Sequence, residues 1–310
     1  MTHDHWTLDD LPDQTGRTAL VTGCTQGGLG FHAGLELARR GATVVLAGRN
    51  AEALATAERA LVAEVPDARL TSLDLDLADL SSVRRAAILA EDLGPVHILL
   101  NNAGVMAPSH SRTPDGLELQ LATNHFGPFL LTGLLLPQLV EAGDARVVTV
   151  SSLMHKNARR APLDDPRSPH GRYHRWQAYS RTKLANLLFT FELDRRLHRA
   201  GVPVAAMAAH PGYSGTHLVA NGQLGRSSGG FASILDAANR AISQSAAAGA
   251  LPLLMAATAD VPGSSYCGPG GPGEVRGPPR LVGCTRLARD EHAQRELWEL
   301  SERTVGLTYP

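Results

Sequence analysis

Short apolar runs alternate with longer segments of mixed polarity along most of this chain. The runs are nearly continuous in aliphatic residues and end at turn residues, which is typical of strands in a sheet covered on both faces. They predict strands at residues 17–21, 42–47, 69–73, 97–100, 146–150 and 204–208. The longer segments repeat apolar residues at helical spacing and predict helices at residues 29–40, 51–65, 82–91, 178–199 and 290–304. This alternation with short links predicts an α/β fold, a Rossmann-type doubly wound parallel sheet.

The same pattern predicts a single domain. Residues 1–16 would form an N-terminal tail and residues 17–310 one Rossmann-fold domain. Two segments depart from the alternation: a surface excursion at residues 153–178 and a C-terminal extension at residues 261–310.

Glycine and proline content sets two further expectations. Residues 261–280 contain Gly-Pro-Gly-Gly-Pro-Gly and then Gly-Pro-Pro, so we predict no regular element there. The Gly/Ser-rich stretch at residues 222–230 is either a substrate lid or a plain flexible connection.

Length and charge narrow the class of protein. The 310 residues are 43% hydrophobic, enough for a large core, and the formal net charge is −1. Nucleic-acid binding normally needs a clustered basic excess, so we expect no nucleic-acid partner. The N-terminus lacks the basic start and apolar run of a signal peptide. The longest apolar stretch, residues 126–140, is broken by Gly and Pro and predicts a buried helix, not a membrane span.

The cysteines indicate a reducing compartment. Cys24, Cys267 and Cys284 are too few and too unevenly spaced for a disulfide framework, so we predict a cytoplasmic location. None has metal-ligand spacing to another cysteine, and His3 and His5 lie at a terminus, where solvated histidines are expected. We therefore predict no metal site.

A glycine-rich turn follows the first predicted strand and precedes a helix. It reads Thr22-Gly23-Cys24-Thr25-Gln26-Gly27-Gly28-Leu29-Gly30. Glycines let backbone N–H groups approach a diphosphate, and the helix N-terminus adds partial positive charge. Such a turn alone is weak evidence, but its position between strand and helix favours a dinucleotide site. The predicted contacts are Gly23, Thr25, Gln26, Gly28, Leu29 and Gly30.

The end of the second strand bears on the choice of cofactor. NAD-specific sites usually place an acid there to accept from the ribose 2′-OH, whereas this chain has Ala47-Gly48-Arg49-Asn50. Arg49 either pairs with a 2′-phosphate or is a solvated surface arginine. We predict NADP(H), with NAD(H) as the alternative.

Acidic residues close the third strand. An aspartate in Asp74-Leu75-Asp76-Leu77 either accepts from the adenine amino group or belongs to the N-cap region of the next helix. We predict that Asp76 and Leu77 contact the cofactor.

A tyrosine and a lysine lie four residues apart, in Tyr179-Ser180-Arg181-Thr182-Lys183. On a helix this spacing puts both on one face, and a phenol needs a nearby cation to transfer protons near neutrality. Only Lys183 and Lys156 are lysines among 29 basic residues, and an ammonium is not interchangeable with a guanidinium. Ser151-Ser152 follows the fifth strand, where a hydroxyl would lie at the ligand-binding edge or simply form a turn.

Several other side chains have no predicted role. Lys156 lies in the excursion without an evident function, and His155 is expected to be a loop histidine without catalytic duty. Trp176 and Tyr213 are better explained by buried packing than by substrate contact.

Taken in order, these motifs resemble the short-chain dehydrogenase/reductase family over nearly the whole chain after Gly16. Residues 123–132 and 183–189, and the long gap between Ser152 and Tyr179, are similar to its retinol-dehydrogenase and protochlorophyllide-reductase-like branch. The resemblance rests on Thr22-Gly23 with Gly28-Leu29-Gly30, Asn101-Asn102-Ala103-Gly104, Asn124, Ser152, Tyr179-x-x-x-Lys183 and His210-Pro211-Gly212.

The resemblance implies a role for each matching residue. Tyr179 would exchange a proton with the reacting oxygen, which Ser152 would hydrogen-bond, while Lys183 would lower the pKa of the tyrosine and hold the nicotinamide ribose. Asn124 would support a water-linked proton relay. The remaining implied cofactor contacts are Asn102, Ala103 and Gly104 on the adenosine side and Pro211 and Gly212 beside the nicotinamide.

The chain departs from the family at the glycine-rich turn, which holds one extra residue, either Gly27 or Gly28. We expect cofactor binding to survive. The predicted function is an NADP(H)-dependent oxidoreductase that interconverts a carbonyl and an alcohol on a fairly apolar small molecule. The alternatives are a reductase of a carbon–carbon double bond and a non-catalytic dinucleotide-binding regulator. Family habit also suggests a homo-oligomer.

Overall fold

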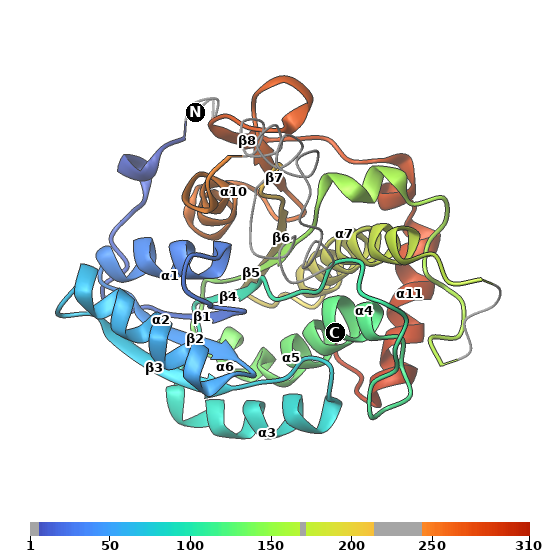
Figure 1. Cartoon of the computed structure of the whole chain (residues 1–310), viewed down its shortest axis with the longest axis horizontal. Coiled ribbons are helices and arrows are strands. Elements are labelled where there is room, and N and C mark those ends of the chain that lie inside the picture. The colour runs from blue at the N-terminus through green and yellow to red at the C-terminus, as the bar shows by residue number, and fades with distance from the viewer. Residues whose placement is uncertain (1–5, 168–171, 214–243) are drawn as a thin grey trace, which may run out of the picture.

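The computed structural model describes residues 6–167, 172–213 and 244–310, and its centre is an eight-stranded sheet (Figure 1). The strand order is β3-β2-β1-β4-β5-β6-β7-β8, and all neighbours are parallel except β7 and β8. The bounds are β1 (Thr18–Thr22), β2 (Thr43–Gly48), β3 (Arg69–Asp74), β4 (Ile98–Asn101), β5 (Ala145–Val150), β6 (Val204–Ala209), β7 (Tyr266–Pro269) and β8 (Pro279–Leu281). The order of the first six strands confirms the predicted doubly wound sheet.

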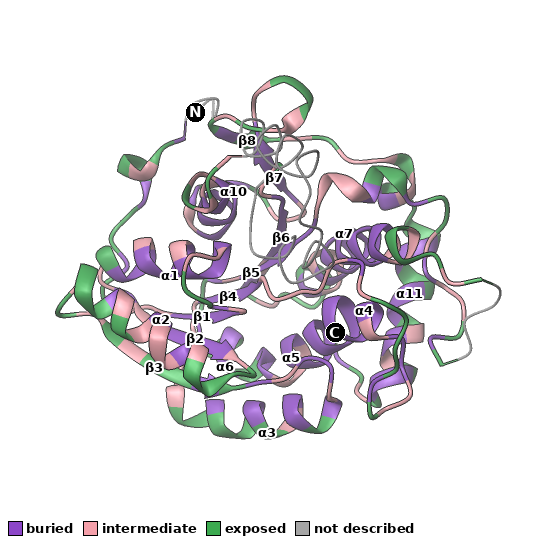
Figure 2. Ribbon diagram, in the orientation of Figure 1, coloured by how far each residue is buried: buried purple, intermediate pink, exposed green. Residues whose placement is uncertain are grey.

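Helices cover both faces of this sheet (Figures 1 and 2). One face carries α1 (Leu29–Arg39), α2 (Ala51–Glu64) and α10 (Ala246–Thr258). The other carries α3 (Leu80–Ala90), α5 (Gly127–Leu134), α6 (Leu136–Glu141), α7 (Arg175–Arg199) and α11 (Glu291–Val305). A short α4 (Leu119–Leu121) and a π-helix (Ala122–Phe126) precede α5.

The sequence forms this sheet because successive residues of each central strand enter opposite cores. In β1, Ala19 and Val21 belong to the α1–α2–α10 core, whereas Leu20 belongs to the core beneath α5 and α7. The central strands are therefore apolar at most positions, which is why their runs are continuous rather than alternating, whereas β3 at the edge of the sheet is mostly exposed.

The expectation of no regular element at residues 261–280 is wrong. This segment supplies β7 and the start of β8, which extend the sheet beyond β6. Pro269 and Pro279 pair across the antiparallel ladder at the outer edge of the sheet, the place in a sheet where a residue without an N–H is tolerated. The C-terminal extension is thus part of the sheet.

The predicted N-terminal tail lies partly within the described residues, and the Gly/Ser-rich stretch lies outside them. In the predicted N-terminal tail, the side chains of Trp6 and Leu11 are buried against the core beside α1. His3, His5 and the Gly/Ser-rich residues 222–230 lie outside the described residues. No helix within residues 6–167, 172–213 and 244–310 is both long and apolar enough to cross a bilayer.

Candidate active site

The predicted site residues lie along one edge of the sheet. Because β1 to β6 are parallel, their carboxyl ends meet at the same edge, and the strand order changes over between β1 and β4, the position where sheets of this kind bind ligands in a crevice. The glycine-rich turn leaves β1, Asn102 follows β4, Ser152 follows β5 and Pro211 follows β6. Helix α7 comes from a segment far along the chain and carries Tyr179 and Lys183, and the Lys183 ammonium donates to the carbonyl oxygen of Val150 at the end of β5.

The extra residue of the glycine-rich turn is taken up in a β-turn. The N–H of Gly28 donates to the carbonyl oxygen of Thr25 at 2.9 Å, and Gly27 has a φ of 75°. A positive φ at the third position of such a turn requires glycine. Thr25 and Gln26 are exposed on the outside of this turn.

The helix that follows begins at Leu29 without a capping side chain. Its N-cap is Gly28, and no acidic residue lies in the first turn. Uncapped N–H groups and the positive end of the helix dipole form a site suited to a diphosphate. The local structure of this turn and helix start therefore suits the diphosphate contacts that the resemblance implies.

The Asn102 side chain links the segment after β4 to the end of β1. Asn102 Nδ2 donates to the carbonyl oxygen of Thr22 at 2.8 Å, and a Cβ on Gly30 would lie 2.6 Å from that nitrogen. Gly23 has a φ of 71°, and a Cβ there would lie 2.8 Å from Cα of Ala103. Both glycines are required by close backbone approach.

Thr22 holds the segment after β4 in place, a role that the motif Thr22-Gly23 alone did not predict. Its hydroxyl is buried and accepts from the N–H groups of Asn102 and Ala103, each at 3.0 Å. The threonine therefore fixes the start of the segment after β4. A hydroxyl residue at the end of a strand, directly before the glycine, was the signal.

The predicted adenosine end of this edge is exposed to solvent. Arg49 follows β2 and is exposed, with no ion pair to any residue in the described ranges. Asp76 Oδ1 accepts from the N–H of Ala78 at 2.9 Å, and the N-cap of α3 is Asp79. Leu77 is buried, and a Cβ on Gly127 would clash with its carbonyl oxygen.

Asn124 lies in the π-helix that precedes α5, a distortion often found at functional sites. Its amide is fully engaged: Oδ1 accepts from the N–H of Val105 at 2.8 Å, and Nδ2 donates to the Val105 carbonyl at 2.9 Å and to Thr182 Oγ1 at 3.0 Å. A Cβ on Gly104 would lie 3.0 Å from Asn124 Oδ1 and 3.7 Å from Lys183 Nζ. Asn124, Gly104 and Lys183 are thus neighbours.

Tyr179 and Ser152 are neighbours at this edge. Ser152 lies two residues after β5 and caps a 3-10 turn (Leu153–Asn157), and Tyr179 lies in the second turn of α7 with only 6% of its surface exposed. Burial raises the pKa of Tyr179 to about 12, and the nearby Ser152 hydroxyl acts in the opposite direction.

Lys183 is held on the same face of α7. Its Nζ donates to the carbonyl oxygen of Val150 at 3.0 Å and lies 5.7 Å from the ring centroid of Tyr179. Burial lowers the pKa of this lysine to about 8. The Lys183 ammonium thus lies beside the phenol whose pKa it is predicted to lower.

Two aromatic side chains near this cluster correct the expectation of buried packing. Trp176 is 49% exposed and Tyr213 is 44% exposed. The Trp176 ring stands edge-on to the Tyr179 ring, with centroids 6.5 Å apart. Tyr213 directly follows Pro211-Gly212 at the end of β6. An exposed aromatic ring therefore borders the catalytic tyrosine candidate.

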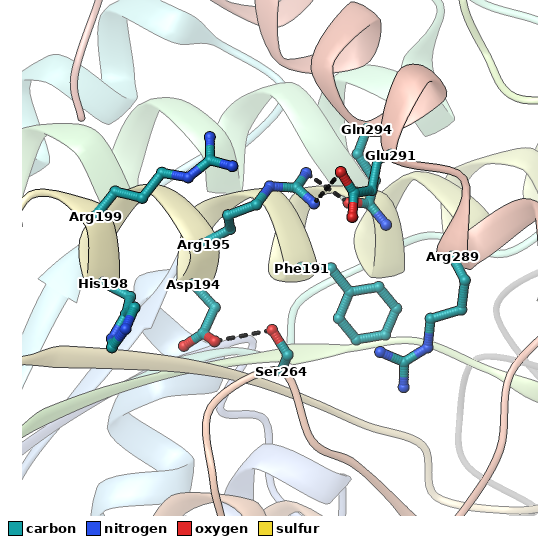
Figure 3. A pocket seen from close by; sticks show the side chains of 9 residues that line it. All are labelled: Phe191, Asp194, Arg195, His198, Arg199, Ser264, Arg289, Glu291 and Gln294. Carbon is teal, nitrogen blue, oxygen red and sulfur yellow. Dashed lines mark hydrogen bonds and ion pairs between the residues drawn. The ribbon is translucent and has the colours of Figure 1, made fainter.

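A pocket of about 320 Å³ lies near the far end of α7, in a different part of the molecule (Figure 3). Two pairs of its polar side chains contact each other: Ser264 donates to Asp194 at 2.8 Å, and Arg195 lies 3.5 Å from Glu291. None of the predicted site residues lines it. The candidate active site is the strand edge, not this pocket.

Acidic, histidine and cysteine side chains do not cluster for metal binding in the described ranges. Cys24, beside the glycine-rich turn, is fully buried, and burial raises the pKa of its thiol to about 12. The predicted site thus offers the Ser152 and Tyr179 hydroxyls, the Lys183 ammonium and the uncapped backbone N–H groups of α1, which suit a phosphate-bearing organic cofactor better than a metal ion.

Comparison with known proteins agrees with this site. The family described as short chain dehydrogenase matches residues 17–162. Human retinol dehydrogenase 13 is 37% identical over 95% of this chain and 86% of its own length. An uncharacterized oxidoreductase of Schizosaccharomyces pombe is 40% identical over 69% of this chain and 65% of its own. A crystal structure of an uncharacterized protein from Mycobacterium paratuberculosis, 42% identical, superposes with a TM-score of 0.81 over 99% of both chains.

Proposed function

The chain belongs to the short-chain dehydrogenase/reductase family, in its retinol dehydrogenase-like branch, and we propose that it interconverts a carbonyl and an alcohol on a fairly apolar small molecule with NADP(H). The observation that carries this proposal is the meeting of Ser152, Tyr179 and Lys183 at the strand edge, where Tyr179 and Lys183 are buried and Ser152 is partly buried. A phenol, a hydroxyl and an ammonium at one point provide acid–base chemistry next to a dinucleotide cradle.

Each side chain takes one part of the reaction. The nicotinamide, when bound, supplies or accepts the hydride. During reduction the Tyr179 hydroxyl donates its proton to the substrate oxygen, and during oxidation it takes that proton back. Ser152 hydrogen-bonds the same oxygen and orients it. Lys183 places a positive charge beside the phenol, and Asn124, which borders Lys183, continues the polar path away from it.

Arg49 supports NADP(H) over NAD(H). It stands at the end of β2, where an acid would read the ribose 2′-OH, and its exposed guanidinium is available to a 2′-phosphate. The 2′-phosphate would pair with Arg49, while the diphosphate would lie at the N-terminus of α1.

The surroundings of Tyr179 support an apolar substrate. The exposed ring of Trp176 lies edge-on to the Tyr179 ring, so an apolar substrate that reaches the tyrosine would contact it, and the exposed Tyr213 follows the turn at the end of β6. The named relative, retinol dehydrogenase 13, points to an apolar alcohol of the same kind.

The test is to titrate the protein with NADPH and NADH by cofactor fluorescence, then to assay aldehydes and ketones of increasing chain length with NADPH. We expect tighter NADPH binding and a kcat/KM that rises with apolar chain length. Equal binding of both cofactors contradicts the assignment of Arg49. Binding of neither contradicts the proposed function and favours a non-catalytic relative.

A further inference from the structure

Behind the turn at the end of β6 lies a polar cluster that the proposed chemistry does not use. The carboxylate of Glu274 lies 3.0 Å from Lys156 Nζ and 3.3 Å from His210 Nε2. The three side chains come from the excursion, from the end of β6 and from the C-terminal extension. His210 is fully buried, and the Glu274 side chain is 19% exposed.

The backbone around Glu274 is shaped to make these contacts. Glu274 has a φ of 59°, a left-handed conformation that is uncommon for a residue with a side chain and that persists where the surrounding structure enforces it. A Cβ on Gly268 would clash with the His210 imidazole, so glycine at that position makes room for the ring. The local structure accepts strain to bring this carboxylate to the histidine.

His210 connects the carboxylate to the turn. Its Nδ1 accepts from the N–H of Gly212 at 3.2 Å, and burial lowers the pKa of the ring to about 3. The ring is therefore neutral, with its single proton on Nε2, the nitrogen that faces Glu274. The next residue is fixed by the same extension, since the N–H of Tyr213 donates to the carbonyl oxygen of Val275 at 2.9 Å.

We propose that Glu274 is a positioning residue for the nicotinamide end of the cofactor, acting through His210 on the turn formed by Pro211 and Gly212. Lys156 orients the carboxylate from the opposite side. This inference rests on the proposed function, in which that turn flanks the nicotinamide. It gives the second lysine of the chain a role and makes the C-terminal extension part of the site.

The test compares two ligands that share the adenosine end. One is NADPH, and the other is 2′,5′-ADP, which carries the 2′-phosphate but lacks the nicotinamide. We expect Glu274→Ala to weaken NADPH binding about tenfold, the effect of losing one polar contact with a charged group, and to leave 2′,5′-ADP binding unchanged. Glu274→Gln should restore most of the affinity, because the amide oxygen keeps the close contact with His210 Nε2.

A matched control is Glu299→Ala, which removes an exposed acid from the same extension, 3.8 Å from Arg303, and should change neither affinity. A kinetic readout supports the binding data: with NADPH deuterated at the transferred position, the isotope effect on kcat should rise in Glu274→Ala. Unchanged NADPH affinity in Glu274→Ala, or equal weakening of both ligands, overturns the positioning role. Wild-type protein that binds neither ligand overturns the proposed function itself.

Discussion

The two ends of the candidate cofactor site differ in how much water they see. At the catalytic end, Tyr179 and Lys183 are 6% and 5% exposed. Burial raises the pKa of the tyrosine and lowers the pKa of the lysine, which favours the neutral form of each. At the predicted diphosphate and adenosine end, Thr25 and Gln26 of the glycine-rich turn and Arg49 after β2 are exposed. Groups that do chemistry need a perturbed environment, whereas a charge that only recognises a phosphate can act from the surface.

This difference predicts how each end responds to substitution. At the buried end, one missing atom should stop turnover while binding persists. At the exposed end, a changed charge should alter the choice of cofactor while turnover persists. Variants at the two ends should therefore separate kcat from cofactor affinity.

The largest effect is expected from Tyr179→Phe, which removes the proton-transferring hydroxyl and keeps the ring that packs against Trp176. We expect kcat to fall by about 10²- to 10⁴-fold, the usual contribution of a general acid, with NADPH affinity nearly unchanged. Steady-state kinetics and a fluorescence titration measure the two quantities. Tyr173→Phe is the control, because it removes a phenol that bonds Gln120 at 2.6 Å outside the catalytic group. Near-normal turnover in Tyr179→Phe would reject the assigned role.

A smaller effect is expected from Arg49→Asp, since an acid at this position repels a 2′-phosphate and accepts from a 2′-OH. The NADPH dissociation constant should rise by about 10- to 100-fold, as for a lost charge-assisted hydrogen bond, while NADH binding is kept or improved. Arg59→Asp on α2, also exposed, serves as the control for added negative charge. If the preference does not move, another residue reads the 2′-phosphate.

The smallest effect is a pH dependence. In reduction, Tyr179 must be protonated, which holds below its pKa of about 12, and Lys183 must be charged, which holds below about 8. Reductive kcat/KM should be flat below pH 8 and fall about tenfold per unit above it. Oxidation needs the ionised phenol and the charged Lys183. Its kcat/KM should rise with the fraction of ionised phenol up to pH 8 and then level off, because above pH 8 the loss of the lysine charge offsets the further ionisation of the phenol. Lys183→Met should abolish the break near pH 8; a break that survives belongs to another group.

Part of the site followed from short motifs. The glycine-rich turn, Asn102, Ser152 and the Tyr179/Lys183 pair are each local features, and a parallel sheet gathers strand ends at one edge. Their meeting at that edge therefore followed once the strands were identified.

Other features depended on contacts between distant segments. Lys156 and Glu274 are 118 residues apart, so no local pattern relates them. Trp176 and Tyr213 look like core residues by type, yet the fold leaves both exposed. Strands β7 and β8 form in a Gly/Pro-rich segment because the edge beside β6 offers a partner and tolerates proline there.

By itself the sequence determined the Rossmann-type sheet, the order of its first six strands along the chain, and the placement of Ser152 after a strand and of Tyr179 and Lys183 on one helix face, because periodicity and tight turns are properties of neighbouring residues. Only the tertiary structure decided the pKa values of Tyr179 and Lys183, the exposure of Trp176 and Tyr213, and the contact between Glu274 and His210 at the turn after β6. Burial and long-range contact set these features, and both arise only when segments far apart in the chain pack together.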